Sequence, residues 1–462
     1  MLQEILLDIL CIIIELKMEN FAKLGISEDV LSVLKLHGFT EPTEIQIKAI
    51  PLALAGRDII GSSATGSGKT LAFASPIIEN LVPNGNVQAL ILTPTRELAE
   101  QVAESIRHFA KNKKLNVFAI YGGVDIQRQI RNIYKTDILV GTPGRIKDHL
   151  QRGTLKLNEI KFLVLDEVDR MLDMGFHRDV EFIVGKCPIK RQTMLFSATI
   201  SADLDYLAKK YTQNPEEVSA KSFIEDTQLK QIFYDVPSDQ KFSLLVHLLK
   251  QETSDLAMVF CSTRRNADII ANSLQEVGIR AKAIHGGLAQ NKRLSVLRDF
   301  HDKEFNILVC TDVAARGLDI KNVTHVYNYD LPKESKDYIH RIGRTARAGE
   351  NGKVVNILSS RDYENFRNIQ RINSNEIIRE ELPVFERVKV NYSNRDEFDE
   401  DSRTRGRRSR DLHNNSRRGG SLRGTSRYSS RSNSGRNGRS SGRSSSFGSR
   451  NFRGNRNNSR RY

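Results

Sequence analysis

The chain has 462 residues, with 71 Lys and Arg against 56 Asp and Glu and 39% hydrophobic residues. This length excludes a single small domain and predicts two or three folded units. The net charge of +15 is concentrated in residues 401–462, which hold 18 Arg, 16 Ser, 9 Gly and 8 Asn. These residue types cannot build an apolar core, so we expect residues 383–462 to form a disordered basic tail.

The first residues, 1–20, are expected to lie outside the folded units. Residues 2–16 are rich in Leu and Ile but too short and acidic for a membrane span, and they lack the features of a secretory signal. Met18 reads as a natural start, so we interpret residues 1–17 as a mis-called extension, which an intact mass would test.

The four cysteines lie far apart and form no Cys-x-x-Cys pair. Neither a disulfide framework nor a zinc site is indicated, and a reducing cytoplasm is the expected location.

Short apolar runs alternate with longer stretches of helical pattern along most of the chain. In the first half the expected strands are residues 58–61, 89–93, 117–121, 137–140, 162–165 and 194–197. In the second half they are residues 231–236, 257–261, 281–285, 307–311, 325–328 and 354–358. This alternation is typical of parallel sheets covered on both faces. It predicts two tandem α/β domains, residues 21–213 and 229–382, joined by a polar hinge at 214–228.

A glycine-rich segment follows the first expected strand, where residues 62–70 read SSATGSGKT. In such a turn, backbone N–H groups point at phosphate oxygens, Lys69 neutralises phosphate charge and the Thr70 hydroxyl faces magnesium. The strict pattern has Gly where Ser63 stands, and a plain strand-to-helix turn is the alternative. The position between a strand and a helix favours a nucleotide site.

An acidic cluster, DEVD at residues 166–169, ends the fifth expected strand. Asp166 is expected to hold magnesium through water, and Glu167 to act as the base for hydrolysis. An acidic cluster at a strand end is by itself more often a solvated helix start. The phosphate loop upstream makes the metal interpretation the better one.

Taken together, these segments resemble the DEAD-box RNA helicases, and the resemblance runs from Phe21 to about Leu358. It implies two RecA-like domains, ATP and Mg²⁺ as cofactors, and an RNA-stimulated ATPase. GFTEPTEIQ at residues 38–46 is similar to the adenine-reading Q motif, and a glutamine pairs well with the adenine edge. The ATP-binding residues implied are Phe21, Thr43, Gln46, Thr65, Gly66, Ser67, Gly68, Lys69, Thr70 and Asp319.

Further segments are similar to the family's RNA-facing motifs: PTRELA at 94–99, Gly122-Gly123, TPGR at 142–145 and VFCSTR at 259–264. Loops of this kind hold a strand by its phosphates without reading its sequence. The RNA-binding residues implied are Pro94, Arg96, Gly123, Thr142, Arg145, Arg264, Gly286, Thr311 and Arg341.

HRIGRTAR at residues 340–347 resembles the motif that carries the arginine fingers of the family. Arg344 and Arg347 are implied to supply positive charge to the transferring phosphate when the two domains close, so the expected catalytic set is Lys69, Glu167 and this pair. Residues implied to couple hydrolysis to strand separation are Asp169, Ser197, Thr199, Gln290, Arg293 and His340.

The chain departs from the family pattern at a few positions. Val168 replaces the Ala of the DEAD tetrapeptide, Ser63 and Ala64 replace Ala-Gln, and Ala346 replaces Gly. No charged or metal-facing group is lost. Overpacking by Val168 is expected to cost about 1 kcal/mol unless a neighbour shrinks, which affects turnover rate and not reaction class.

The expected function is ATP-dependent, local and non-processive RNA unwinding and RNA–protein remodelling by a monomer that does not act at a membrane. The expected partner is structured or duplex RNA, and ribosomal precursors or RNA-decay proteins are further candidates. Two alternatives stay open: a DNA-directed helicase of the same architecture, and an RNA-binding protein whose ATP site is vestigial. The tail is expected to add unspecific RNA affinity, against the alternative of a solubilising extension.

Overall fold

The computed structural model describes residues 18–63, 66–198, 202–220, 229–252, 255–315, 318, 320, 322–346, 351–373 and 376–390. The expected N-terminal extension and nearly all of the basic tail lie outside these residues. Within them, no helix combines the length and apolar character needed to cross a bilayer.

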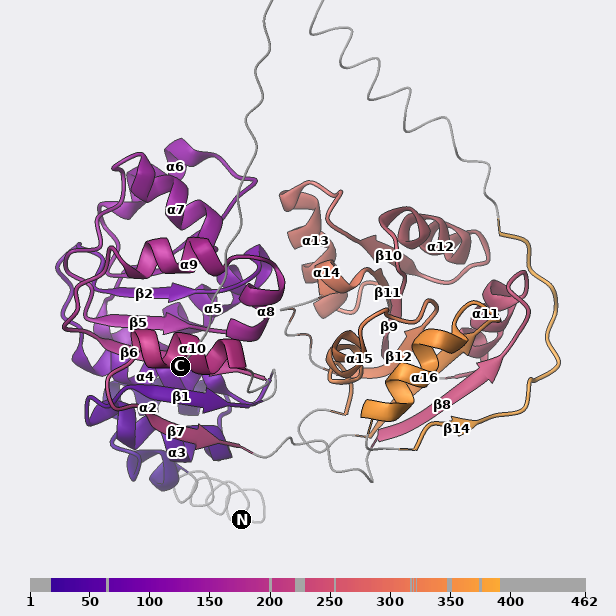
Figure 1. Ribbon diagram of the computed structural model, residues 1–462, viewed down its shortest axis with the longest axis horizontal. Coiled ribbons are helices and arrows are strands. Elements are labelled where there is room, and N and C mark those ends of the chain that lie inside the picture. Colours follow the sequence, from indigo (N-terminus) through magenta and orange to yellow (C-terminus); the bar gives the residue numbers. More distant parts are fainter. Residues whose placement is uncertain are drawn as a thin grey trace, which may run out of the picture. The chain divides into compact units, whose positions relative to one another are not determined.

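The first domain is built on a parallel sheet of seven strands in the order β3-β4-β2-β5-β6-β1-β7 (Figure 1). The strands are β1 (Ile59–Ser62), β2 (Ala89–Leu92), β3 (Val117–Ile120), β4 (Ile138–Gly141), β5 (Phe162–Leu165), β6 (Gln192–Ser197) and β7 (Glu216–Ser219). The helices are α2 (Glu28–Leu36), α3 (Glu44–Leu54), α4 (Lys69–Asn80), α5 (Arg96–Phe109), α6 (Ile126–Ile133), α7 (Pro143–Gln151), α8 (Val168–Asp173), α9 (His177–Val184) and α10 (Ala202–Tyr211), with a short 3-10 turn at Lys111–Lys113.

The second domain repeats this plan, with the strand order β10-β11-β9-β12-β13-β8-β14. Its strands are β8 (Leu229–Asp235), β9 (Leu256–Phe260), β10 (Ala281–Ile284), β11 (Ile307–Cys310), β12 (Val323–Asn328), β13 (Gly352–Leu358) and β14 (Ile378–Arg379). Its helices are α11 (Lys241–Gln251), α12 (Arg264–Glu276), α13 (Gln290–His301), α14 (Asp312–Ala315), α15 (Ser335–Ile342) and α16 (Tyr363–Ile372).

Each sheet is buried on both faces, as the continuous apolar strands require. In β5, Phe162 and Val164 belong to one core cluster and Leu163 and Leu165 to the cluster on the opposite face. The strands of the second sheet divide in the same way between two clusters. The predicted fold class, two tandem RecA-like α/β domains, is therefore confirmed for the described residues.

Two predicted domain boundaries are wrong. Glu216–Ser219, assigned to the hinge, forms β7 and pairs in parallel with β1, so the first domain extends beyond residue 213. The second domain extends beyond residue 382, because Phe385, Val388 and Val390 pack against its core. Ser243 fixes this last segment, since its hydroxyl donates to the Val388 carbonyl at 3.2 Å and accepts from the Val388 N–H at 2.9 Å.

Candidate functional site

Gln46, the predicted adenine reader, lies in the first turn of α3 with its amide already oriented. Its Oε1 accepts the Thr43 N–H at 3.0 Å, and its Nε2 donates to the Gly68 carbonyl at 3.0 Å. Gly68 has φ of 90°, and a Cβ there would lie 2.4 Å from Gln46 Nε2. A glycine is therefore required where the phosphate loop meets this glutamine.

The phosphate loop connects β1 to α4, with Gly66 and Gly68 in the left-handed region. The Lys69 ammonium, which is buried, donates to the Ser63 carbonyl at 3.1 Å. The Ser67 hydroxyl donates to Ser63 Oγ at 2.9 Å. Ser63, one of the departures from the family pattern, thus contacts both the cation and the turn of the loop. Thr65 lies outside the described residues, and Thr70 is half-buried in the first turn of α4.

The acidic residues Asp166, Glu167 and Asp169 follow the carboxyl end of β5, as predicted, and all three are buried. Burial raises the pKa of Asp166 above its usual range; the Lys69 charge opposes this rise, and the nearby Glu167 and Asp169 charges add to it. Glu167 has φ of 51°, an uncommon backbone conformation for a side chain of its size. Its Oε2 lies 3.5 Å from Nε of Arg170, which is also buried.

A backbone hydrogen bond connects the phosphate loop to the expected coupling segment. The Ser63 N–H donates to the Ser197 carbonyl at 3.0 Å, one residue beyond the β1–β6 pairing. A shift of the phosphate loop on binding phosphate would therefore be transmitted to Ser197 through this hydrogen bond. Thr199 lies outside the described residues.

Phe21, predicted to contact the nucleotide, is fully buried in the core of the first domain, in one cluster with Ile45 and Phe73. In this conformation its ring supports α3 from behind. A direct contact with ATP stays a prediction.

The residues predicted to face RNA in the first domain all lie where strands end. Arg96 follows β2 and packs over Gly122-Gly123, and a Cβ on Gly123 would lie 2.2 Å from its guanidinium. The Thr95 hydroxyl caps α5 by accepting the Leu98 N–H at 3.3 Å. Pro94 is buried before this cap. Thr142 occupies the N-cap position of α7 without a side-chain cap hydrogen bond, and Arg145 lies in the first turn of that helix.

The second domain carries the same arrangement. Arg264 follows β9, packs within 3.5 Å of a Cβ position on Gly286, and is preceded by Thr263, whose hydroxyl accepts the Asn266 N–H at 3.1 Å. His285 is fixed beside these glycines, because its Nε2 lies 2.8 Å from Asp268 and its Nδ1 accepts the Gly287 N–H at 3.1 Å. Both sheets thus present an arginine over a pair of glycines.

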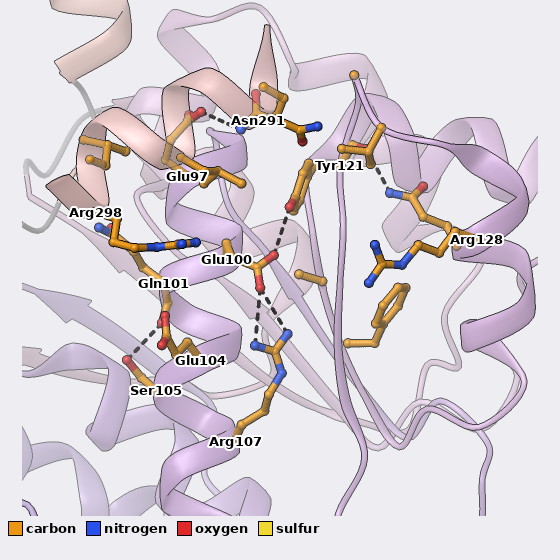
Figure 2. Close-up of a pocket in the computed structure, with 18 of the residues that line it drawn as sticks. Glu97, Glu100, Gln101, Glu104, Ser105, Arg107, Tyr121, Arg128, Asn291 and Arg298 are labelled. Carbon is orange, nitrogen blue, oxygen red and sulfur yellow. Dashed lines mark hydrogen bonds and ion pairs between the residues drawn. The ribbon is translucent and has the colours of Figure 1, made fainter. Parts of the chain in front are cut away.

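The expected coupling residues Gln290 and Arg293 contact α5. Glu97 accepts from Gln290 Nε2 at 2.8 Å, and Arg293 Nε lies 3.1 Å from the same carboxylate. Figure 2 shows the adjoining pocket, of about 1370 Å³, with Glu100 between Tyr121 and Arg107. The Tyr121 hydroxyl donates to Glu100 at 3.0 Å, and burial together with the Glu100 charge raises the pKa of Tyr121.

Arg341, predicted to bind RNA, is buried in the second domain. Its Nε and Nη2 donate to the two carboxylate oxygens of Asp312 at 2.6 and 2.8 Å. Its Nη1 donates to Asn328 Oδ1 at 2.8 Å, and the guanidinium lies 4.8 Å from the centre of the Phe260 ring. In this conformation Arg341 holds α14, which begins after the buried Thr311, against the sheet.

Arg344, one predicted arginine finger, is also buried. Its Nε donates to the His340 carbonyl at 3.3 Å, and its Nη1 donates to the Leu318 carbonyl. To reach a phosphate the guanidinium must leave the Leu318 carbonyl. Arg347 and Asp319 lie outside the described residues.

Sequence reasoning missed three groups beside these sites: the Ser63 hydroxyl, Arg170, and the pair Gln129 and His149. A serine in a phosphate loop and an arginine after an acidic cluster carry weak signals. Gln129 and His149 carry none, because a polar residue on a helix is ordinarily exposed, and their burial follows from how α6 and α7 pack.

Comparison with known proteins gives two family matches: DEAD/DEAH box helicase over residues 43–207, and helicase conserved C-terminal domain over residues 240–349. The chain is 45% identical over 372 residues to a DEAD-box ATP-dependent RNA helicase CshA of Geobacillus kaustophilus, covering 80% of each. It is 47% identical over 349 residues to an ATP-dependent RNA helicase CshA of Listeria monocytogenes, covering 75% of this chain and 67% of the relative. It is also similar to the structure of S. cerevisiae Dbp5 bound to RNA and ADP BeF3, with a TM-score of 0.72, 31% identity, and coverage of 78% of this chain and 95% of that one.

Proposed function

Because this chain belongs to the DEAD-box family of ATP-dependent RNA helicases, we propose that it uses ATP to open short RNA duplexes locally and to remodel RNA–protein complexes. Its membership confirms the family that the motifs predicted. Local, non-processive action is our proposal for how this enzyme works.

One observation carries this proposal: the catalytic groups are divided between the two domains. Lys69, Asp166 and Glu167 lie in the first domain, whereas Arg344 lies in the second and donates to the carbonyl of Leu318 in that domain. Turnover then requires a rearrangement that brings the arginine to the phosphate. Ligands that bind the rearranged state more tightly shift the enzyme towards it, so ATP and RNA binding are coupled.

The phosphate end of the site suits a magnesium ion. Asp166 and the Thr70 hydroxyl would supply the oxygen ligands that Mg²⁺ prefers, and burial raises the pKa of Asp166, which a bound cation would lower. A bound Mg²⁺ would neutralise charge developing on the phosphates. Glu167, whose N–H donates to Asp166 Oδ1 at 3.0 Å, would accept the proton of the attacking water.

RNA would be held by its phosphates. Arg96 and Arg264 each lie over a pair of glycines at strand ends, where a backbone can approach closely. Such contacts position a strand without reading its bases. RNA as the substrate, over single-stranded DNA, is tested by comparing how strongly each stimulates the ATPase.

The decisive experiment is Glu167→Gln. This variant should lower RNA-stimulated ATP turnover by a factor of about 100 or more, because it removes the base and keeps the shape. ATP-dependent RNA binding should persist, since the phosphate loop is intact. Glu217→Gln, an exposed glutamate on the edge strand β7, is the matched control and should leave both measurements unchanged.

Either of two results would contradict this role: wild-type turnover in Glu167→Gln, or loss of ATP-dependent RNA binding together with turnover. Absence of ATP turnover in the wild-type protein would instead favour an RNA-binding protein with a vestigial ATP site. We further propose a cytoplasmic monomer that acts on ribosomal precursors or with RNA-decay proteins. Crosslinking in cells, followed by sequencing of the bound RNA, tests that assignment.

A further inference from the structure

We propose that Gln129 and His149 are positioning residues that fix Arg145 and the Tyr121–Gly123 loop relative to each other for RNA binding. Neither residue belongs to the motifs described above. The inference rests on the proposed contact between Arg145 and RNA, and the experiment below separates failure of one from failure of the other.

The Gln129 side chain bridges two loops that leave neighbouring strands of the first sheet. Gln129 lies on α6 and is 2% exposed. Its Nε2 donates to the Tyr121 carbonyl, at the end of β3, at 3.0 Å. Its Oε1 accepts from Nη1 of Arg145, which follows β4, at 2.8 Å. One amide thus determines the spacing between the glycine loop and the arginine.

His149, on α7 and fully buried, fixes the direction of that amide. Its Nε2 lies 3.0 Å from Gln129 Oε1, and its Nδ1 lies 2.9 Å from the Thr154 hydroxyl. Since Gln129 Oε1 only accepts hydrogen bonds, His149 Nε2 must carry a proton. A flipped amide would turn its NH₂ group towards Arg145 Nη1 and its oxygen towards the Tyr121 carbonyl, so it is excluded.

Burial and the neighbouring charge both favour the neutral form of His149. Burial lowers the pKa of His149, and the Arg145 charge lowers it further. Nδ1 lies 2.9 Å from the Thr154 hydroxyl, which also donates to the His149 carbonyl at 3.1 Å. The ring therefore locks Gln129 without adding a second positive charge beside Arg145.

Arg145 is held through Nη1 and through Nε, which lies 3.8 Å from Asp148 Oδ2. Its Nη1 donates to Gln129 and, at 3.4 Å, to the Val124 carbonyl, while its side chain keeps 15% of its surface exposed. A guanidinium has five N–H donors, so the remaining donors can contact a phosphate oxygen in a fixed direction. An unsupported arginine would have to lose rotamer freedom on binding, which weakens the contact.

The test is the RNA concentration that gives half-maximal stimulation of the full-length enzyme, measured with a single-stranded oligonucleotide. Gln129→Met keeps the length of the side chain and removes all three hydrogen bonds of the amide. We expect the half-maximal concentration to rise about tenfold or more, the scale of losing a hydrogen bond to a charged group. Unstimulated ATPase and the KM for ATP should not change. Gln127→Met, an exposed glutamine on the same helix, is the matched control.

Two more variants define the mechanism. Gln129→Glu keeps an acceptor for Arg145 and His149 but loses the donor to the Tyr121 carbonyl, so it should restore only part of the RNA affinity that Gln129→Met loses. His149→Phe keeps a ring but loses both polar contacts, and it should resemble Gln129→Met. Urea unfolding of each variant shows whether it is folded at the assay temperature.

Arg145→Ala and the double variant with Gln129→Met complete the experiment. If Arg145→Ala weakens RNA binding and Gln129→Met adds nothing to it, the positioning role is supported. Wild-type RNA affinity in folded Gln129→Met and His149→Phe would overturn it, as would additive losses in the double variant. A parallel rise in the KM for ATP would also overturn it, as a general structural effect. If Arg145→Ala itself binds RNA normally, the proposed contact of Arg145 fails instead.

Discussion

Backbone strain at single residues marks the nucleotide motifs of both domains. Six non-glycine residues of the described part have positive φ, and two of them, Glu167 and Ala346, lie in motifs identified from sequence. A side chain in this region costs about 1–2 kcal/mol relative to ordinary helical backbone. Strain of this kind persists only where the surroundings fix it, and it is common at active sites.

Ala346 stands where the family pattern has glycine, and its φ is 53°. We predict that Ala346→Gly raises the free energy of unfolding by about 0.5–1 kcal/mol, because relief of strain exceeds the added chain entropy of glycine. Urea unfolding measures the change. Ala55→Gly is the control, since Ala55 has φ of −73° and no strain to relieve. A lower stability of Ala346→Gly would show that the strain is absent.

Gly352 explains why position 346 tolerates little more than alanine. A Cβ on Gly352 would lie 2.7 Å from the Ala346 nitrogen and 2.8 Å from its Cβ. The two segments therefore pack backbone against backbone at this point, where β13 begins.

At the scale of elements, the first turn of α8 places Val168 in the core. Val168 is fully buried in the cluster that contains Leu165, Met171 and Leu195. Val168→Ala is predicted to lower the free energy of unfolding by about 1–2 kcal/mol, because two buried methyl groups are lost. A stability equal to or above the wild type, in urea unfolding, would instead confirm the overpacking expected from sequence.

Glu252 joins the end of α11 to β12 and β13. Its carboxylate lies 2.5 Å from Lys353 Nζ and 3.1 Å from His325 Nε2, and accepts from the Tyr327 hydroxyl at 2.9 Å. Burial alone would raise the pKa of Glu252, but the hydrogen bonds from His325, Lys353 and Tyr327 and the Lys353 charge outweigh it and lower the pKa to about 2. This carboxylate therefore prefers to be charged in the folded state.

The pKa of Glu252 is lower in the folded than in the unfolded state. Its contribution to the free energy of unfolding is therefore full above about pH 4.5 and is lost as the pH falls towards 2. We predict that Glu252→Gln destabilises the enzyme by about 2–3 kcal/mol at pH 7 and by much less near pH 3. Urea unfolding across this pH range measures the difference. Glu276→Gln, an exposed glutamate on α12, is the control, and a pH-independent loss in Glu252→Gln would contradict the linkage.

The elements that sequence patterns find and miss differ in composition. All twelve expected strands are present, because buried parallel strands are continuous runs of apolar residues. The pattern misses β7 because it is an edge strand reading EEVS with only Val218 buried, and β14 because it has two exposed residues. Edge strands carry polar residues, so pattern alone assigns them to loops.

The site divides along the same line. Lys69, Asp166 and Gln46 are predictable because the chemistry proposed for them requires particular residue types at fixed spacing within a short segment. Gln129 and His149 interact through tertiary contacts between two separate helices, so no short sequence motif identifies them.

At the scale of the whole molecule, the two sheets have the same strand order, each strand of the second corresponding to the strand seven places earlier. The groups proposed to act in catalysis or to contact phosphates lie at or beyond the carboxyl ends of these strands. The division of labour between domains is therefore a division between two copies of one scaffold, which differ in their loops.

The basic tail adds a second kind of RNA binding in our proposal. Deleting residues 401–462 removes 18 Arg, and we predict weaker RNA binding with a flatter dependence on salt. The slope of log K against log salt should fall by about 0.7 for each phosphate that the shortened chain no longer neutralises, while unstimulated ATPase stays constant. Binding titrations at several salt concentrations measure the slope. An unchanged slope would exclude the tail from RNA binding and favour a solubilising role.

In our proposal, the paired arrangement of Arg96 over Gly122-Gly123 and Arg264 over Gly286-Gly287 makes activation depend on the length of the RNA. In the proposed RNA site, a few nucleotides would contact one of these arginines, and only an oligomer long enough to reach both would connect the two domains. Activation should then switch on abruptly at a threshold length as the oligomer is extended, whatever its base composition.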